Sequence, residues 1–175
     1  MNESMMDRVP PHNHEAEQSV IGAIFLEPQA LITASEILMP DDFYRTAHQK
    51  IFQTMIRLSD QGKAIDVVTV TEELSAKKEL EDVGGLSYLS ELANAVPTAA
   101  NIAHYAKIVE EKALLRRLIR TATKIVEDGY TREDEVEVLL SEAEKKMMEV
   151  ANRKNAGDFK HVKDVLVQTY DNIEQ

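Results

Sequence analysis

Apolar residues spaced three and four apart dominate residues 14–98 and predict several short amphipathic helices packed into one compact head. The first helix is expected to begin near His14, because Asn13 is a favourable N-cap. Prolines and glycines separate the apolar segments, as is typical between short helices. Residues 1–13 precede this pattern and are expected to form a flexible N-terminus.

One segment of the head has a composition typical of a strand. Residues 67–71 are β-branched throughout, which favours extended structure. The run continues directly into Glu72 and Glu73, and Asp66 stands where a helix N-cap would lie. A strand remains possible from the pattern alone, but we favour a helix.

The composition changes over residues 99–153, which contain no proline and a single glycine, Gly129. Two long helices are expected here, joined at residues 128–131 as an antiparallel αα-hairpin. Gly129 suits the left-handed position after a helix, and Thr131 is expected to cap the second helix.

The first hairpin helix changes its apolar face near Ala113. At about 100° per residue, its early apolar residues share one side: Ile102, Tyr105, Ala106, Val109 and Ala113. The later ones lie roughly opposite: Leu115, Leu118, Ile119, Ala122, Ile125 and Val126. Its start should therefore cover the head, and its end should project and pack on the second helix. The later arc is wider than one helix contact requires, so a second apolar contact is expected there.

The second hairpin helix repeats apolar residues at spacings of four and three from Val136 to Val150. This spacing is typical of a two-helix seam. The seam is predicted to consist of Leu115, Leu118, Ala122, Val136, Leu140, Ala143 and Met147.

Residues 152–158 form a polar break that includes Gly157, and residues 154–175 are expected to form a linker and a short linker helix. One face of that helix is predicted to dock on a partner: Val162, Val165, Leu166, Thr169 and Ile173. The pattern stops without a cap, so we expect the chain to be a truncated piece of a longer protein. The predicted fold class is thus all-α: a compact helical head, a projecting antiparallel αα-hairpin and a short linker helix.

Charge and composition narrow the class of partner. The chain has 175 residues, 43% hydrophobic, with a net charge of −11, and residues 1–100 carry 16 acidic and 7 basic side chains. A surface of this kind disfavours direct nucleic-acid binding, which needs clustered lysine and arginine. There is no cysteine, no apolar run near the roughly 20 residues of a membrane span and no secretion signal. We therefore expect a cytoplasmic protein without membrane contact.

Candidate chemistry is sparse. The only Gly-Lys pair, at Gly62, lacks the pattern of a phosphate-binding loop, and no nucleophile elbow is present. No catalytic residue, cofactor site or metal site is expected; His12 and His14 are better explained as mobile or capping residues than as ligands. His48 follows Tyr44 by four residues on an apolar face, which predicts a packed, hydrogen-bonded histidine.

An ordered set of residues carries a family resemblance: Pro10-Pro11, the segment 15–22, Asp42-Phe43-Tyr44 with His48, Ile51-Phe52, Ile65-Asp66, Val68-Thr69-Val70, Gly84-Gly85, Tyr88-Leu89, Pro97-Thr98, Asn101 and the segment 105–109. In these positions the chain resembles the N-terminal part of bacterial replicative DNA helicases of the DnaB type, close to the versions in Bacillus-like bacteria. The match extends over most of residues 10–170.

The resemblance implies an ATP-dependent DNA helicase whose RecA-like motor, which would hold ATP and magnesium, is missing from this sequence. It also implies that the heads pair through their hairpins into a trimer-of-dimers collar on a hexameric ring. The collar would receive the C-terminal helicase-binding domain of primase and so couple unwinding to priming at the replication fork. A helicase loader is a further possible partner.

On this basis, Tyr88, Ile119 and Ile125 are candidate apolar anchors for primase, with Glu15 as a polar neighbour. The resemblance does not separate hairpin residues that face the dimer from those that face primase. Two alternatives stay open: a helical adaptor that serves mainly ring assembly, and a domain that contacts single-stranded DNA.

Overall fold

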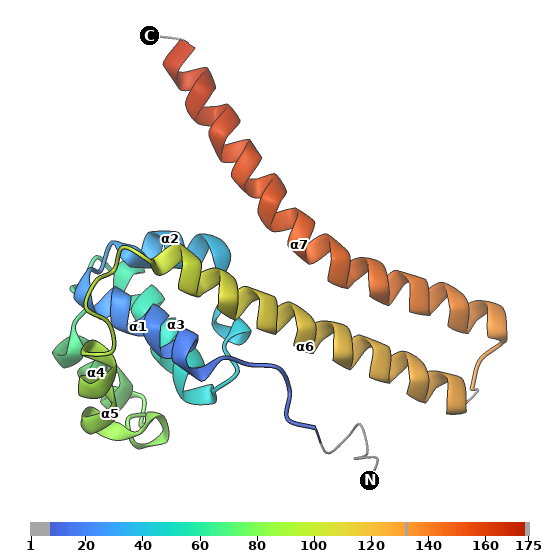
Figure 1. Ribbon diagram of the computed structural model, residues 1–175, viewed down its shortest axis with the longest axis horizontal. Helices are drawn as coiled ribbons and strands as arrows, with labels where there is room; N and C mark the ends of the chain where they lie inside the picture. Colours follow the sequence, from blue (N-terminus) through green and yellow to red (C-terminus); the bar gives the residue numbers. More distant parts are fainter. Residues whose placement is uncertain (1–7, 132, 174–175) are drawn as a thin grey trace. The chain divides into compact units, whose positions relative to one another are not determined.

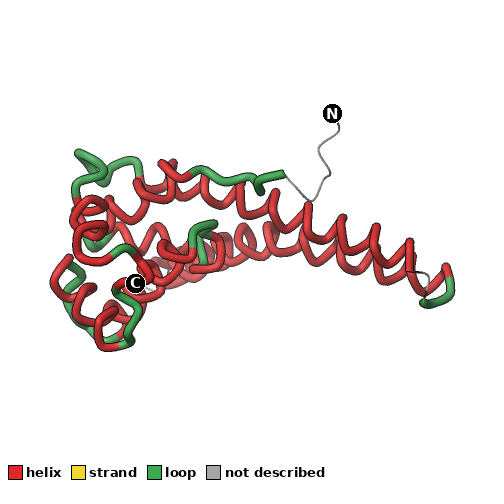
Figure 2. Tube along the Cα trace, turned by 90° about the horizontal axis from the view of Figure 1, so that it is seen from below, coloured by secondary structure: helices red, strands yellow, loops and turns green. Residues whose placement is uncertain are grey.

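The computed structural model describes the backbone of residues 8–131 and 133–173; in the last helix it describes side chains through residue 152 and at residues 166, 169 and 173. Every regular element in this described part is helical, with no strand, so the all-α prediction is confirmed (Figure 2). The chain divides into two compact units between residues 113 and 114, a boundary that lies inside one long helix. We call them the head and the hairpin unit.

The head contains five helices, two short 3-10 turns and the start of a sixth helix (Figure 1). The elements are α1 (His14–Leu26), α2 (Ala30–Ile37), η2 (Pro40–Asp42), α3 (Thr46–Asp60), α4 (Val67–Ala76), η3 (Glu81–Val83), α5 (Gly85–Ala93) and α6 (Ile102–Thr131). Helix α1 packs on α2, α3 and α5, and α4 packs on both α3 and α5.

The first turns of α6 complete the core of the head. Ile102, Ala106 and Val109 are buried in the same apolar cluster as the side chains of α1, α3 and α5. The expectation that the start of this helix covers the head is confirmed. The boundary consequently lies after Ala113, where the apolar face changes, and not at residue 98, where the predicted head ends.

Helices α1 and α5 approach each other closely at Gly22. A Cβ atom at this position would lie 2.7 Å from the backbone oxygen of Leu92 and 3.0 Å from the Cβ of Ala95. Only a residue without a side chain lets the two helices pack at this distance.

Residues 67–71 are helical, as favoured. The side chain of Asp66 accepts the backbone N–H of Thr69 at 2.8 Å, and the hydroxyl of Thr69 accepts the backbone N–H of Asp66 at 3.0 Å. This reciprocal cap satisfies donors at the start of α4 and overrides the strand preference of the β-branched run.

The hairpin turn lies later than predicted. Helix α6 continues through Gly129 to Thr131, and α7 begins at Val136. The expectations of a left-handed Gly129 and of a cap by Thr131 are therefore wrong. Asp128 pairs with Lys124 one turn earlier and with Lys146 on α7, at 3.2 and 2.9 Å, and these contacts hold the last turns of α6 in helical form.

Helix α7 runs from Val136 to Ile173 without interruption. The predicted break at residues 152–158 and the separate linker helix after it are not found. An isolated glycine costs a helix only about 1 kcal/mol relative to alanine, and no proline stands in this stretch. Gly157 therefore does not end the helix.

Candidate interaction surfaces

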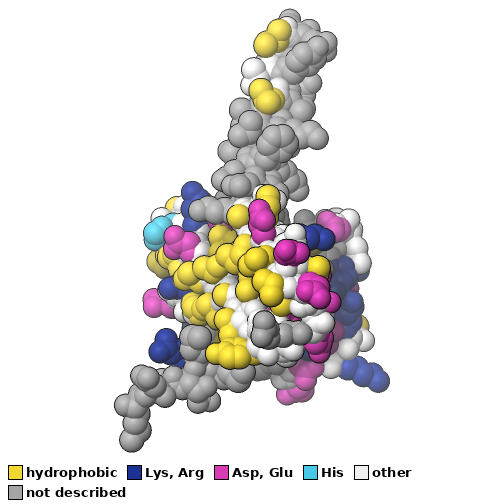
Figure 3. Space-filling view, turned by 90° about the vertical axis from the view of Figure 1, so that its right-hand side faces the viewer, with side chains coloured by type: hydrophobic (Ala, Val, Ile, Leu, Met, Phe, Trp, Pro, Cys, Tyr) yellow, Lys and Arg dark blue, Asp and Glu magenta, His cyan; other side chains and the backbone are white. Residues whose placement is uncertain are grey.

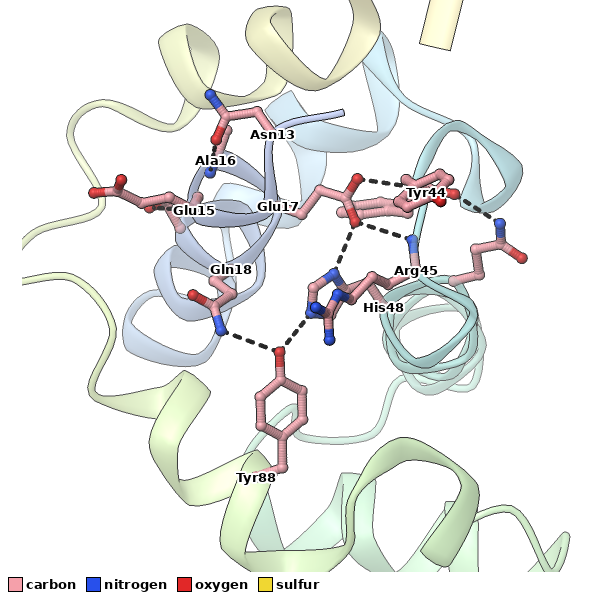
Figure 4. A network of polar contacts seen from close by, with 12 residues as sticks. Asn13, Glu15, Ala16, Glu17, Gln18, Tyr44, Arg45, His48 and Tyr88 are labelled. Carbon is pink, nitrogen blue, oxygen red and sulfur yellow. Dashed lines mark hydrogen bonds and ion pairs between the residues drawn. The ribbon is translucent and has the colours of Figure 1, made fainter. Parts of the chain in front are cut away.

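A buried carboxylate from α1 organises the start of α3. Glu17 is 1% exposed, and its two carboxylate oxygens accept the backbone N–H groups of Tyr44 at 2.8 Å and Arg45 at 3.3 Å (Figure 4). Arg45, the N-cap residue of α3, has no side-chain cap of its own. The Glu17 carboxylate thus takes the place of a side-chain cap and places a negative charge at the positive end of the helix dipole.

The same carboxylate holds His48, whose ring connects α1 to α5. Glu17 Oε1 lies 2.8 Å from His48 Nδ1, and His48 Nε2 lies 2.7 Å from the hydroxyl of Tyr88. A carboxylate can only accept, so Nδ1 carries a proton; with the ring neutral, the Tyr88 hydroxyl donates to Nε2. Gln18 donates to the same hydroxyl at 3.1 Å. We call Glu17, His48, Tyr88 and Gln18 the buried network.

Burial in and around this network shifts the pKa values of Tyr88 and His14. Burial raises the pKa of Tyr88, against the opposing effect of the hydrogen bond from Gln18. Burial also lowers the pKa of His14, with the charge of Arg45 acting in the same direction. The ring of His14 stacks on His48 with 5.4 Å between centroids, so it belongs to the surroundings of the buried network.

The prediction that His48 is packed and hydrogen-bonded is confirmed, but its partners were not foreseen. A signal exists in the sequence, since Glu17 precedes Val20, Ile21 and Ile24 by three, four and seven residues. A carboxylate on the apolar face of a helix must find donors when it is buried. The identity of those donors depends on α3, which is distant in sequence.

Of the residues predicted for primase contact, Tyr88 and Glu15 lie in the head. Tyr88 is half-buried and belongs to the buried network, whereas Glu15 is exposed and points away from it (Figure 4). In the N-terminal segment, predicted to be flexible, His12 stacks on Tyr44 with 4.3 Å between ring centroids.

Ile119 and Ile125 lie in the hairpin unit and differ in their surroundings. Ile119 is 49% exposed. Ile125 is half-buried and lines a hollow of about 250 Å³ between α6 and α7, together with Leu139 and Ala143. Ile125 thus lies partly between the two helices, and the exposed Val136 and Leu140 line the same hollow.

The contact between α6 and α7 differs from the predicted seam. Among the α7 side chains described through residue 152, the half-buried ones are Leu139, Ala143, Lys146 and Val150, and of these only Ala143 is among the seven predicted positions. Leu140 is instead 65% exposed. The other predicted positions are exposed too: Leu115, Leu118, Ala122, Val136 and Met147. Leu139 and Lys146 are thus half-buried next to the predicted Leu140 and Met147, whereas Ala143 lies in the contact as predicted.

The exposed positions form one apolar strip on the hairpin. On α6, the residues of the strip point about 120° around the helix axis from the side that faces α7. On α7, they point about 70–80° around the helix axis from the side that faces α6. Both rotations have the same sense along the chain. Because the two helices are antiparallel, both parts of the strip lie on the same side of the hairpin. Figure 3 shows hydrophobic side chains gathered beside the turn. We call this strip the hairpin face: Leu115, Leu118, Ile119, Ala122, Val126, Val136, Leu140 and Met147.

The predicted docking face of the linker helix lies partly outside the described side chains, which exclude Val162 and Val165. Leu166 and Ile173 are 63% and 76% exposed, and Thr169 is exposed as well.

Two further observations concern only the described residues. They contain no group of three side chains that could hold a metal ion. None of their helices combines the length and hydrophobicity needed to cross a membrane.

Comparison with known sequences identifies relatives over the whole chain. Residues 9–111 match the family model described as the DnaB-like helicase N terminal domain. The chain is 65% identical, over 99% of its length, to the replicative DNA helicase DnaB of Geobacillus stearothermophilus. It is 67% identical, over its full length, to the replicative DNA helicase DnaC of Bacillus subtilis. In both cases it spans only 38% of the relative's length.

Solved structures agree with the sequence matches. The crystal structure of the N-terminal domain of DnaB helicase from Mycobacterium tuberculosis superposes with a TM-score of 0.78 at 40% identity, covering 81% of this chain and 99% of that one. A DnaB-like replicative helicase, described with its interactions with primase, matches with a TM-score of 0.66 at 30% identity, covering 80% of this chain and 31% of that one. The resemblance drawn from the sequence is confirmed: the chain belongs to the DnaB-like helicase N-terminal domain family.

Proposed function

We propose that this chain is the assembly and primase-docking part of a replicative DNA helicase in the bacterial cytoplasm. Its relatives are named replicative DNA helicases, and it corresponds to 38% of their length. The remaining length would contain the motor with its ATP and magnesium. The chain's own part is then to hold subunits together and to receive a partner.

The hairpin face is the single observation that carries the proposal. A soluble monomer rarely leaves a contiguous apolar strip of this kind exposed. Leu140 on α7 is 65% exposed, and Leu118 on α6 is 39% exposed. A second hairpin of the same chain presents a matching strip, and two such strips bury each other in a symmetric contact.

Sedimentation velocity over a range of concentrations tests the assembly role. The wild-type chain should sediment as a dimer or larger species, and Leu140→Asp should shift it towards the monomer. Ile32→Asp is the matched control, because Ile32 is a 66% exposed apolar residue in the head. A wild-type chain that remains monomeric at high concentration would contradict self-association through the hairpin face.

Primase docking is the second part of the proposal. Its support is the structural likeness to a helicase described with its interactions with primase. Tyr88 and Glu15 on the head and Ile119 on the hairpin remain the candidate contacts. The position of Ile125 partly between the two helices favours an indirect role, in which it shapes the surface next to Ile119.

The direct experiment is a calorimetric titration of the chain with the C-terminal domain of the primase from the same organism. Saturable binding supports docking, and its stoichiometry reports how many chains form one site. A folded chain that releases no heat and shows no co-migration with the primase domain would contradict it.

A further inference from the structure

The hydroxyl of Tyr88 points into the head, where it is hydrogen-bonded to His48 and Gln18. It lies 2.7 Å from His48 Nε2 and accepts from Gln18 at 3.1 Å. A tyrosine hydroxyl has one donor and two acceptor positions. The hydroxyl is therefore directed at His48 and Gln18, and the ring of the half-buried side chain is what a partner can reach (Figure 4).

We propose that Glu17 and His48 are positioning residues for Tyr88, and that the docking partner packs an apolar side chain against the tyrosine ring and does not bind its hydroxyl. This inference rests on the proposed function, because the partner is the primase domain.

The geometry explains how residues without surface exposure act on a surface. His48 is fully buried and Glu17 nearly so. The hydrogen bonds from Glu17 to His48 and from His48 to Tyr88 connect α1, α3 and α5 in one line. Glu17 is itself fixed by two backbone N–H groups at the start of α3. Rotation of the tyrosine side chain about its Cα–Cβ bond would break this line at its outer end.

The base of Tyr88 is restrained as well. A Cβ atom at Gly84 would lie 2.8 Å from the Cβ of Tyr88, so the chain passes tightly beneath this side chain. The backbone at Gly84 thus leaves little free space at the base of the side chain, and His48 and Gln18 hold its tip. A preorganised aromatic side chain loses less conformational entropy on binding than a mobile one.

A double-mutant cycle in the primase titration tests the inference. His48→Leu and Tyr88→Phe each remove the same hydrogen bond and keep a ring at position 88. Each should weaken binding about fivefold, and the double variant should weaken it far less than the product of the two effects, because the hydrogen bond between the two side chains can be lost only once. Tyr88→Ala, which removes the ring, should weaken binding more than either.

The matched control is Thr54→Val. Thr54 is a 2% exposed residue of the same helix, and its hydroxyl donates to the backbone oxygen of Lys50 at 2.8 Å. The variant loses a buried hydrogen bond without touching Tyr88, so binding should change less than about twofold. An equal loss of affinity in Thr54→Val would show that any weakening of α3 reduces binding, and it would overturn the positioning role.

A measurement without the partner separates the two proposals. Ring signals of carbon-labelled tyrosine, with Tyr88 assigned by Tyr88→Phe, should show slow hydroxyl-proton exchange in the wild-type chain and fast exchange in His48→Leu. His48→Gln, which keeps an amide between the same partners, should restore part of the protection. Unchanged Tyr88 signals in His48→Leu overturn the positioning role.

Protected signals in a chain that binds no primase domain overturn the proposed function and, with it, the docking part of this inference. Independent, multiplying effects of His48→Leu and Tyr88→Phe show that the hydroxyl contacts the partner and also overturn the inference.

Discussion

Two helical glycines in this chain have opposite environments. Gly22 faces the backbone of α5, where an added Cβ would meet the oxygen of Leu92 at 2.7 Å, whereas a Cβ on Gly129 would meet no atom within 4 Å. The same residue type is therefore required by packing at one position and is only an unfavourable helix former at the other.

Substitution by alanine should separate these cases. Gly22→Ala should lower the free energy of unfolding by about 1–3 kcal/mol, because backbone and Ala95 must move apart to admit the methyl group. Gly129→Ala should raise it by about 0.5–1 kcal/mol, because alanine loses less entropy in a helix. Urea denaturation measures both. Destabilisation by Gly129→Ala would show that this residue is left-handed, as the sequence pattern predicted.

A second pair of residues shares a conformation but not a residue type. Gly62 and Lys78 follow α3 and α4 with φ of +67° and +59°, and each ends its helix with the same pair of backbone hydrogen bonds. The left-handed conformation suits glycine and strains a lysine.

Lys78→Gly should therefore stabilise the head by about 0.5–1 kcal/mol, and Gly62→Ala should destabilise it by a similar amount. Thermal unfolding followed by circular dichroism provides the comparison. If both changes lower the melting temperature, the backbone at Lys78 is not left-handed.

At the scale of elements, the carboxylate of Asp128 connects α6 to α7. Hydrogen bonds from Lys146 and Lys124 hold the pKa of Asp128 below its ordinary value. The stabilisation that Asp128 contributes is complete above the pKa of the unfolded chain, about 3.9. It is lost as the pH falls from there through the lower pKa of the folded state.

Asp128→Asn should thus destabilise the hairpin at neutral pH and should match the wild-type chain in strong acid. Urea denaturation at several pH values measures the difference, and high salt should reduce it, since the pair is partly exposed. A difference that does not depend on pH would mean that the amide disturbs packing and not charge.

The elements of this fold differ in how far the sequence predicts them. The cap at Asp66 is local, so α4 could be inferred against its strand-like composition. The burial of His48 could be inferred from its apolar face, but its link to Glu17 and Tyr88 depends on three helices meeting in space. The turn is predicted from Gly129 and the cap residue Thr131, and the break from a polar run that includes Gly157. Both predictions are wrong, because the Asp128 contacts stabilise the last turns of α6 and a single glycine without a proline does not end α7.

At the scale of the whole molecule, the two isoleucines proposed for docking should respond differently to a charge. Ile119 is 49% exposed in the single chain, so a charge there stays hydrated and should leave the melting temperature of the folded chain nearly unchanged. Ile125 is half-buried and lines the hollow between α6 and α7, so a charge there would lose part of its hydration. Ile125→Asp is therefore expected to lower stability and binding together.

The most direct test of the account is the calorimetric titration of the primase C-terminal domain into the wild-type chain, Ile119→Asp and Ile32→Asp, each with its melting temperature. We expect saturable binding by the wild-type chain and Ile32→Asp, and binding at least about tenfold weaker by Ile119→Asp, which corresponds to about 1.4 kcal/mol, at an unchanged melting temperature. Equal binding by all three chains, or no binding by the folded wild-type chain, would contradict the claim that this domain docks primase through its hairpin.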